Sequence, residues 1–146
     1  MPAISRNATV DWTGTLMEGG GNLKAGTGAF TLPVSFPRRI GEPEGGTSPE
    51  ELLAAAHATC YAMVVAGALG KAGASSRATK VTCTVTADKS DAGIKIMTSR
   101  LEVVAEGLTG MDAATFEKTA KDAEGRCPVS NTLRATMAIE VVAKSS

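Results

Sequence analysis

One long apolar segment limits the folds that this chain can adopt. Residues 48–73 read SPEELLAAAHATCYAMVVAGALGKAG and open with a strong helix-start signal. Ser48 suits the N-cap, Pro49 suits the first helical position, and Glu51 completes an S-x-x-E capping box. The glycines near the end of the segment stop the helix. Because the intervening residues are apolar on nearly every side, we predict a long central helix that is buried on most of its faces.

The composition of this segment argues against a membrane span. Its apolar part, residues 52–69, is rich in alanine and is interrupted by His57, Thr59 and Gly67. We therefore predict that it does not cross a membrane. The N-terminal residues MPAISRNATV lack the apolar core of a signal peptide, so we expect a cytoplasmic protein with no membrane partner.

The charge balance argues against a nucleic-acid partner. The chain has 15 basic and 15 acidic residues, which gives a net charge of zero. Proteins that bind nucleic acid carry a basic patch or an aromatic motif of the RNP type, and neither occurs here. Aromatic residues make up only 3% of the chain, so its core must be built from aliphatic side chains.

The remaining periodicity predicts an α+β fold. Alternation of apolar and polar residues predicts strands, and a capped amphipathic segment predicts a second helix. The strands are expected at 7–16, 22–31, 32–36, 79–88, 94–105 and 136–143, with a turn at 19–22, a loop at 37–47 and the second helix at 112–124. For 146 residues this order predicts a single domain, 1–146, with a mostly antiparallel sheet packed on helices.

Three cysteines are the first candidates for chemistry. Their small, odd number argues against a framework of structural disulfides. A buried cysteine is usually a small apolar residue, which is a sufficient interpretation of Cys60 and a firmer one for Cys83, between Val81 and Val85 on a strand face. Cys127 follows a helix stop in GRCPVS and can begin a short helix, whose N-terminal field favours thiolate. The sequence alone does not place these thiols together.

His57 is the only histidine and lies three residues before Cys60. This spacing allows the two side chains to share a helix face and to form a nucleophile pair. Because no Asp or Asn is evident to orient the ring, we favour a histidine satisfied by packing and one hydrogen bond. One histidine and no C-x-x-C spacing give no familiar zinc ligand set, so no metal is predicted.

Two motifs together resemble the OsmC/Ohr family of thiol peroxidases. SPEELLAAAHATC, residues 48–60, resembles the family signature N-P-E-E-L-x-x-A-A-H-A-x-C, and CPVS at 127–130 resembles its second cysteine motif. The predicted order of strands and helices also fits, over nearly the whole chain. The A-A-H-A and C-P-V-S forms are similar to the OsmC branch. Ohr proteins carry an arginine after two glycines, which GGGN at 19–22 lacks.

The resemblance implies an organic hydroperoxide reductase that acts in oxidative stress defence. Cys60 would be the peroxidatic cysteine, and Cys127 would resolve its sulfenic acid as a disulfide. A dithiol reductant, such as a lipoylated protein, would restore both thiols, and no cofactor is implied. The apolar residues Leu52, Leu53 and Met63 are candidates for walls that favour a lipid-like or aromatic peroxide.

The resemblance also implies an arginine and a glutamate in the site. FPRRI at 36–40 matches an aromatic-x-x-Arg-aromatic context, with Arg39 best aligned, Arg38 as the alternative, and Ile40 where Phe is common. A guanidinium beside the sulfur would favour the thiolate. Glu50 would hold the guanidinium by a bidentate contact. Without the resemblance, Glu50 is a first-turn acid that suits the helix dipole, and the arginines are a solvated pair.

Helix geometry independently predicts a homodimer. Glu50 and Cys60 are ten residues apart on one predicted helix, which separates them by about 15 Å along its axis. If both serve one site, one of them comes from a second copy of the chain, in a symmetric dimer. The family is known for an intertwined dimer, which agrees. Two other functions stay open: a non-catalytic protein that binds an apolar ligand at the dimer interface, and a structural protein with inert thiols.

Overall fold

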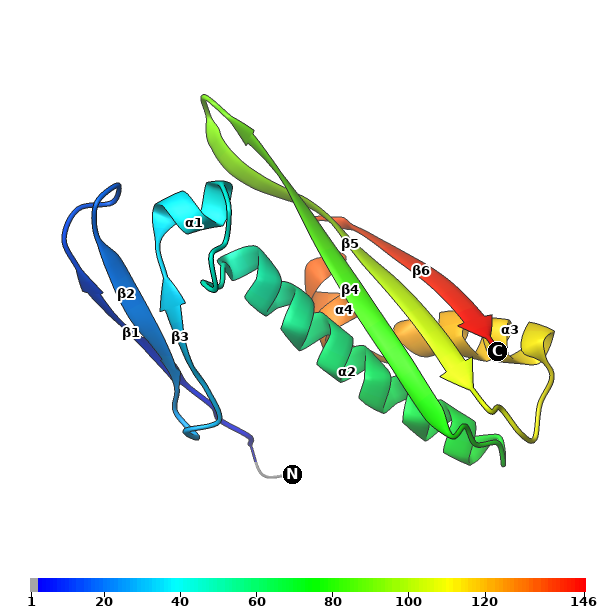
Figure 1. Cartoon of the computed structure of the whole chain (residues 1–146). Coiled ribbons are helices and arrows are strands. Elements are labelled where there is room, and N and C mark those ends of the chain that lie inside the picture. The colour runs from blue at the N-terminus through cyan, green and yellow to red at the C-terminus, as the bar shows by residue number, and fades with distance from the viewer. Residues whose placement is uncertain (1–2) are drawn as a thin grey trace. The chain divides into compact units, whose positions relative to one another are not determined.

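The computed structural model describes residues 3–146, which form two compact units with a boundary after Leu52. Each unit contains a sheet of three strands (Figure 1). Along the chain, three strands are followed by two helices, a strand pair, two more helices and a last strand. This is the predicted α+β order, with the short helix that was expected to begin at Cys127 and one short helix, at 36–40, that was not predicted.

The N-terminal unit is an antiparallel sheet in the order β1-β2-β3. Its strands are β1 (Ala8–Thr13), β2 (Gly20–Ala25) and β3 (Thr31–Val34). As predicted, Pro33 lies on an edge strand, where its missing N–H leaves no ladder bond unmade.

The predicted turn at 19–22 is wrong, because Gly20 and Gly21 belong to β2. The chain reverses before them, where Gly14 adopts a positive φ of 83°. A side chain at Gly19 would overlap the carbonyl oxygens of Thr13 and Thr15. The glycine run therefore allows its backbone to pass close to the backbone of residues 13–15, and it does not form the turn itself.

The predicted loop at 37–47 begins with a short helix, α1 (Phe36–Ile40). Ser35 caps it by accepting a hydrogen bond from the Arg38 backbone N–H at 3.4 Å, and Pro37 lies in its first turn. These start signals were hidden by the surrounding glycines and prolines. This helix carries the candidate arginines.

The long helix is α2 (Pro49–Lys71), which runs unbroken for 23 residues. Ser48 Oγ accepts from the Glu51 backbone N–H at 3.1 Å, as the capping box predicts. The Glu51 carboxylate instead accepts from Thr47 Oγ1 at 2.7 Å, so one half of the box is made. Gly73, with a φ of 70°, follows the helix end.

Burial of α2 differs from the prediction. One stripe is buried and the opposite face is open, with Met63 69% exposed. The buried residues are His57, Tyr61, Val65, Ala68 and Leu69. By length and composition alone α2 is long and apolar enough to cross a membrane, but the core helix of a globular protein passes the same test, so this finding does not overturn the expectation. Only 28% of its apolar stretch is buried within one chain.

The C-terminal unit has the sheet order β4-β5-β6. The hairpin of β4 (Ala78–Ser90) and β5 (Gly93–Glu106) is antiparallel, and β6 (Ala138–Ser145) pairs with β5 in parallel (Figure 1). All three strands were predicted. Two helices lie between β5 and β6 in the chain. They carry the chain back to the end of the sheet where β5 begins, so β6 can run parallel to β5.

These two helices are α3 (Ala113–Glu124) and α4 (Pro128–Leu133). Asp112 caps α3, as predicted, by accepting from the Thr115 backbone N–H at 2.7 Å. The core of the C-terminal unit joins α2, α3 and one face of β5. Its largest apolar members are Tyr61, Val65, Leu69, Leu101, Val103 and Phe116.

Candidate active site

Two thiols that are 67 residues apart in the sequence meet in the C-terminal unit. Cys60 lies in the middle of α2, and Cys127 is the N-cap residue of α4. Their Sγ atoms are 3.1 Å apart, and both are free thiols. Cys127 is fully buried and Cys60 is partly exposed. A solute can therefore reach Cys60, whereas Cys127 is shielded from solvent.

The start of α4 faces both sulfurs. Cys127 Sγ accepts a hydrogen bond from the Ser130 backbone N–H at 3.5 Å. Burial raises the pKa of the Cys60 thiol, and the neighbouring Cys127 raises it further, while the backbone of Val129 offsets part of this rise. Within the C-terminal unit Cys60 is therefore a poor nucleophile at neutral pH. A nearby positive charge would favour its thiolate.

The N-terminal unit contains an ion pair of the kind that could supply this charge. Arg39 on α1 and Glu50 in the first turn of α2 are joined at 2.7 Å, Nη2 to Oε1. Arg39 Nε lies 3.2 Å from each carboxylate oxygen, so the fork is held at two points. Their side chains are 27% and 16% exposed. The hydrogen bond to Arg39 lowers the pKa of Glu50, which keeps the carboxylate charged.

The structure distinguishes the two candidate arginines. Glu50 pairs with Arg39, whereas the Arg38 side chain lies at Gly46 and lines a separate polar depression. Arg38 contributes its backbone N–H to the cap of α1. Arg39 is therefore the arginine with a fixed orientation.

An apolar cavity of about 260 Å³ adjoins Arg39 in the N-terminal unit. Apart from the guanidinium, its lining is almost entirely aliphatic or aromatic. The lining residues are Val10, Trp12, Leu16, Leu23, Val34, Phe36, Arg39, Pro49 and Leu52. Of the three predicted wall residues, Leu52 belongs to this lining.

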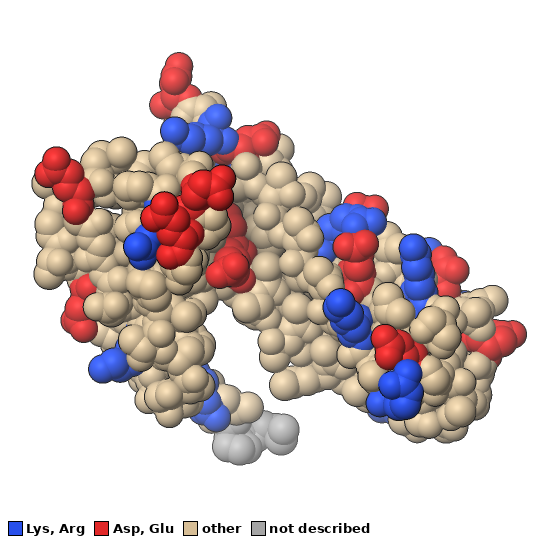
Figure 2. Space-filling model, viewed as in Figure 1, with Lys and Arg blue, Asp and Glu red and all other residues tan. Residues whose placement is uncertain are grey.

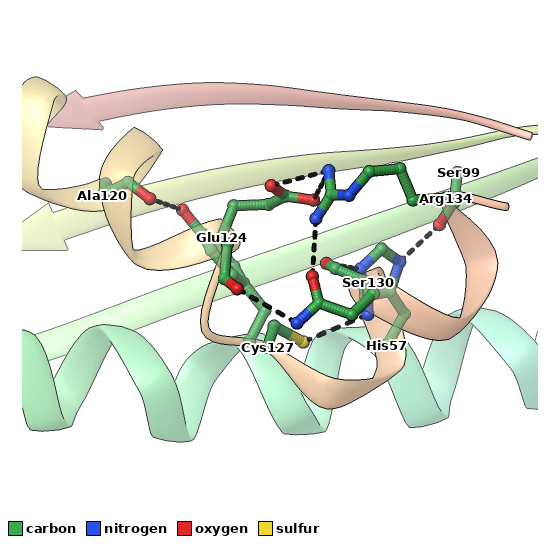
Figure 3. A network of polar contacts seen from close by, with 10 residues as sticks. His57, Ser99, Ala120, Glu124, Cys127, Ser130 and Arg134 are labelled. Carbon is green, nitrogen blue, oxygen red and sulfur yellow. Dashed lines mark hydrogen bonds and ion pairs between the residues drawn. The ribbon is translucent and has the colours of Figure 1, made fainter.

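His57 occupies a buried network beside Cys127 (Figure 3). Its Nδ1 lies 2.6 Å from Ser99 Oγ and its Nε2 lies 2.6 Å from Ser130 Oγ, and all three residues are fully buried. Burial lowers the pKa of the ring, so it is neutral. The interpretation of a satisfied helix histidine predicted one hydrogen bond, and the structure has two.

Cys83 has polar neighbours that its sequence context did not reveal. Its Sγ lies 3.2 Å from Ser99 Oγ and 3.7 Å from His57 Nδ1. Burial nevertheless raises the pKa of this thiol. Neither Ser99 nor Ser130 carried a sequence signal as a partner of His57, because they lie 42 and 73 residues further along the chain.

Metal binding has no visible basis in this arrangement. Among residues 3–146, no three or more His, Cys, Asp or Glu side chains are grouped so that they could hold a metal ion. The C-terminal unit offers a thiol pair, and the N-terminal unit offers an oriented guanidinium beside an apolar cavity.

The chain belongs to the OsmC-like protein family, whose model matches residues 41–142. It is 35% identical over 144 residues to Peroxiredoxin OsmC of Escherichia coli K12, covering 97% of this chain and 99% of that protein. Peroxiredoxin OsmC of Shigella flexneri matches to the same extent. The predicted family resemblance is therefore confirmed.

Solved structures share the fold at lower identity. An organic hydroperoxide resistance protein OsmC from Legionella pneumophila matches with a TM-score of 0.77 and 22% identity, covering 99% of both chains. An organic hydroperoxide resistance protein from Elizabethkingia anophelis matches with a TM-score of 0.79 and 20% identity, also over 99% of both chains. These matches confirm the predicted OsmC-like α+β fold.

Proposed function

We propose that this protein is a thiol-dependent peroxidase that reduces organic hydroperoxides to alcohols. The observation that carries the proposal is the 3.1 Å approach of the Cys60 and Cys127 sulfurs in a chain 35% identical to a peroxiredoxin. Cys60 is the accessible thiol and is assigned the peroxidatic role. Cys127, buried behind it, is assigned the resolving role.

The reaction proceeds in three balanced steps. The Cys60 thiolate attacks the terminal peroxide oxygen, the O–O bond breaks, and the alkoxide takes up a proton and leaves as the alcohol. Cys127 then attacks the sulfenic sulfur, which forms the Cys60–Cys127 disulfide and releases water. The sulfurs must approach by about 1 Å to reach the length of a disulfide bond. A dithiol reductant, for example a lipoylated protein, reduces the disulfide and becomes a disulfide itself.

Arg39 and Glu50 are assigned to activation of Cys60. A guanidinium beside the sulfur would lower the thiol pKa and could donate a hydrogen bond to the peroxide. Because α2 is unbroken, Glu50 and Cys60 of one chain lie about 15 Å apart along its axis. We therefore assign the Arg39–Glu50 pair of one subunit to Cys60 of its partner, in a homodimer with two sites.

The open face of α2 supports this dimer. It is apolar and made mostly of small residues, which allow helices to approach closely, and a single chain leaves it uncovered. Its exposed members are Ala55, Ala56, Thr59, Met63, Ala66 and Gly67. A second copy of the helix would bury this face, which a water-soluble monomer would leave exposed. In this assembly residues 1–146 act as one domain of a cytoplasmic enzyme.

The apolar cavity supports an organic substrate. A hydroperoxide held at its O–O end by Arg39 could place its carbon chain or ring among the aliphatic residues that line the cavity. The same cavity favours the second candidate, a non-catalytic protein that binds an apolar ligand. The two functions differ in what happens to the thiols.

Intact-mass measurement after one equivalent of cumene hydroperoxide tests the proposal. We expect the loss of two hydrogens, located by peptide mapping in a Cys60–Cys127 disulfide, and turnover when a dithiol is added. Cys60→Ser should abolish turnover, while the control Cys83→Ser retains it. Undiminished turnover in Cys60→Ser would refute the proposal. Unchanged thiols together with binding of the apolar ligand would favour the non-catalytic function.

A further inference from the structure

The buried His57 ring connects the helix that carries Cys60 to the helix that carries Cys127. His57 lies on α2, three residues before Cys60, and its Nε2 bonds to Ser130 Oγ at 2.6 Å. Ser130 lies in the first turn of α4, and its backbone N–H donates to Cys127 Sγ. The His57 side chain thus links α2 directly to Ser130, the residue whose backbone binds the sulfur of Cys127 (Figure 3).

The hydrogens of this network favour one arrangement. A neutral imidazole donates at one nitrogen and accepts at the other. If Ser130 donates to Nε2, then Nδ1–H donates to Ser99 Oγ and the Ser99 hydroxyl can donate to Cys83 Sγ. Every hydroxyl hydrogen then has an acceptor, which a buried site requires. The opposite tautomer leaves the Ser130 hydroxyl hydrogen without a partner among the contacts of residues 3–146.

We propose that His57 is a positioning residue for disulfide formation: through Ser130 it holds Cys127 against Cys60. This inference rests on the proposed function, because it concerns the step in which Cys127 resolves the Cys60 sulfenic acid. Both ring nitrogens are occupied by serine hydroxyls, so the ring has no free proton or lone pair for Cys60 or Cys127. Its contribution is therefore to geometry rather than to acid–base catalysis.

Other contacts hold α4 without involving His57. Asn131 Nδ2 donates to Gly125 O at 3.0 Å, and Arg134 pairs with Glu124 at 2.9 Å. These bonds tie α4 to the end of α3, which carries neither thiol. Loss of the His57–Ser130 bond should therefore leave α4 folded but free to shift relative to α2. A shift of about 1 Å can cost on the order of a hundredfold in rate.

Two substitutions of His57 separate the two sides of the ring. The amide of Gln reaches the place of Nε2 and can keep the bond to Ser130, whereas the amide of Asn reaches only the place of Nδ1, beside Ser99. Both remove the titrating ring. If His57 acts through Ser130, His57→Gln should preserve the function and His57→Asn should not. Ser130→Ala removes the same bond while leaving the ring in place.

The first readout is the equilibrium of the thiol pair with reduced and oxidised glutathione, which involves no peroxide. Oxidised glutathione converts the two thiols into the disulfide and yields two reduced glutathione molecules, so the equilibrium reports their effective concentration. We expect His57→Asn and Ser130→Ala to lower this effective concentration about tenfold or more. His57→Gln should lower it less than about threefold. Thr132→Val, which removes an exposed hydroxyl contact to Pro128 O on α4, is the matched control and should match wild type.

The second readout separates the two steps of the peroxide reaction. With cumene hydroperoxide, wild type and all variants should consume the Cys60 thiol at rates within about twofold, since the first step needs no Cys127. His57→Asn and Ser130→Ala should then accumulate a sulfenic acid that dimedone traps, because resolution is slow. Thermal unfolding monitors the folding of every variant.

Several results would overturn the inference. Equal effective concentrations for His57→Asn and His57→Gln, or a Ser130→Ala value equal to wild type, would show that the bond to Ser130 does not position Cys127. If the His57 variants fail to fold, Ser130→Ala decides alone. If wild type forms the disulfide with glutathione but does not react with peroxide, the proposed function fails while the positioning result stands.

Discussion

Cys60 is a thiol whose surroundings in its own unit oppose its proposed task. Burial and the neighbouring Cys127 raise its pKa, whereas attack on a peroxide needs the thiolate. The side chain that we propose to reverse this effect is Arg39, whose guanidinium is oriented by Glu50. Because Glu50 is kept ionised by that same contact, the pair can deliver a positive charge in a defined direction.

Removal of this charge should be measurable at the sulfur. We expect Arg39→Ala to raise the pKa of Cys60 by about one to three units, because an opposite charge close to an acid lowers its pKa by this amount. Thiolate absorbance at 240 nm as a function of pH, with the Cys60→Ser signal subtracted, measures it. Arg38→Ala is the matched control, since Arg38 does not contact Glu50. An unchanged Cys60 pKa in Arg39→Ala would contradict the assignment.

At the scale of elements, α2 is anchored by polar groups one turn apart. His57 bonds to Ser99 on β5 and Ser130 on α4, and the buried Tyr61 hydroxyl donates to Ala120 O on α3. Because a buried polar group needs a hydrogen-bond partner, each contact fixes the rotation of α2 about its axis and its position along that axis. The apolar stripe alone would tolerate small slides of the helix. These contacts therefore fix the position of Cys60 on α2 relative to the rest of the C-terminal unit.

The anchor at Tyr61 can be tested by stability. Tyr61→Phe keeps the packed ring and removes one buried hydrogen bond, so we expect a loss of about 1 kcal/mol in the free energy of unfolding. Tyr61→Ala also removes the ring from the core and should cost about 3–5 kcal/mol. Urea unfolding measures both. A Tyr61→Phe protein as stable as wild type would show that the hydroxyl bond does not stabilise the fold.

Elements with strong local signals were predicted well, and elements whose signals compete were not. The caps at Ser48 and Asp112 located α2 and α3, and alternation located β4 and β5. The helix α1 was missed because Gly and Pro around it indicate a loop. The glycines of β2 were assigned to a turn because the close approach that requires them is invisible in the sequence.

At the scale of the whole molecule, charge and apolar surface differ in their distribution. On the face shown in Figure 2, acidic and basic side chains are interspersed over the C-terminal unit rather than separated by sign. One side of α2, in contrast, is a continuous face of mostly small apolar residues that stays uncovered in a single chain. This asymmetry favours a partner of the same apolar kind, which a second copy provides.

Complementation between two inactive variants tests the shared site. If Cys60 of one subunit uses Arg39 of the other, a heterodimer of Cys60→Ser with Arg39→Ala contains one intact site. An equal mixture that exchanges subunits freely should then regain about a quarter of wild-type activity, since half of its dimers are mixed. Each variant alone should be nearly inactive. No recovery after verified subunit exchange would show that each chain builds its own site.

The sequence by itself determined the family, the order of the main elements and the identity of the candidate cysteines, because these depend on local patterns: caps, alternation and two short motifs. Even the prediction of a dimer needed only the helix rise and the assignment of Glu50 and Cys60 to one site. Only the tertiary structure decided which side chains meet. The thiol pair, the pairing of Glu50 with Arg39 rather than Arg38, and the partners of His57 depend on packing between segments 11 to 73 residues apart. Contacts across such separations depend on how the elements pack around the core, and local sequence patterns do not predict them.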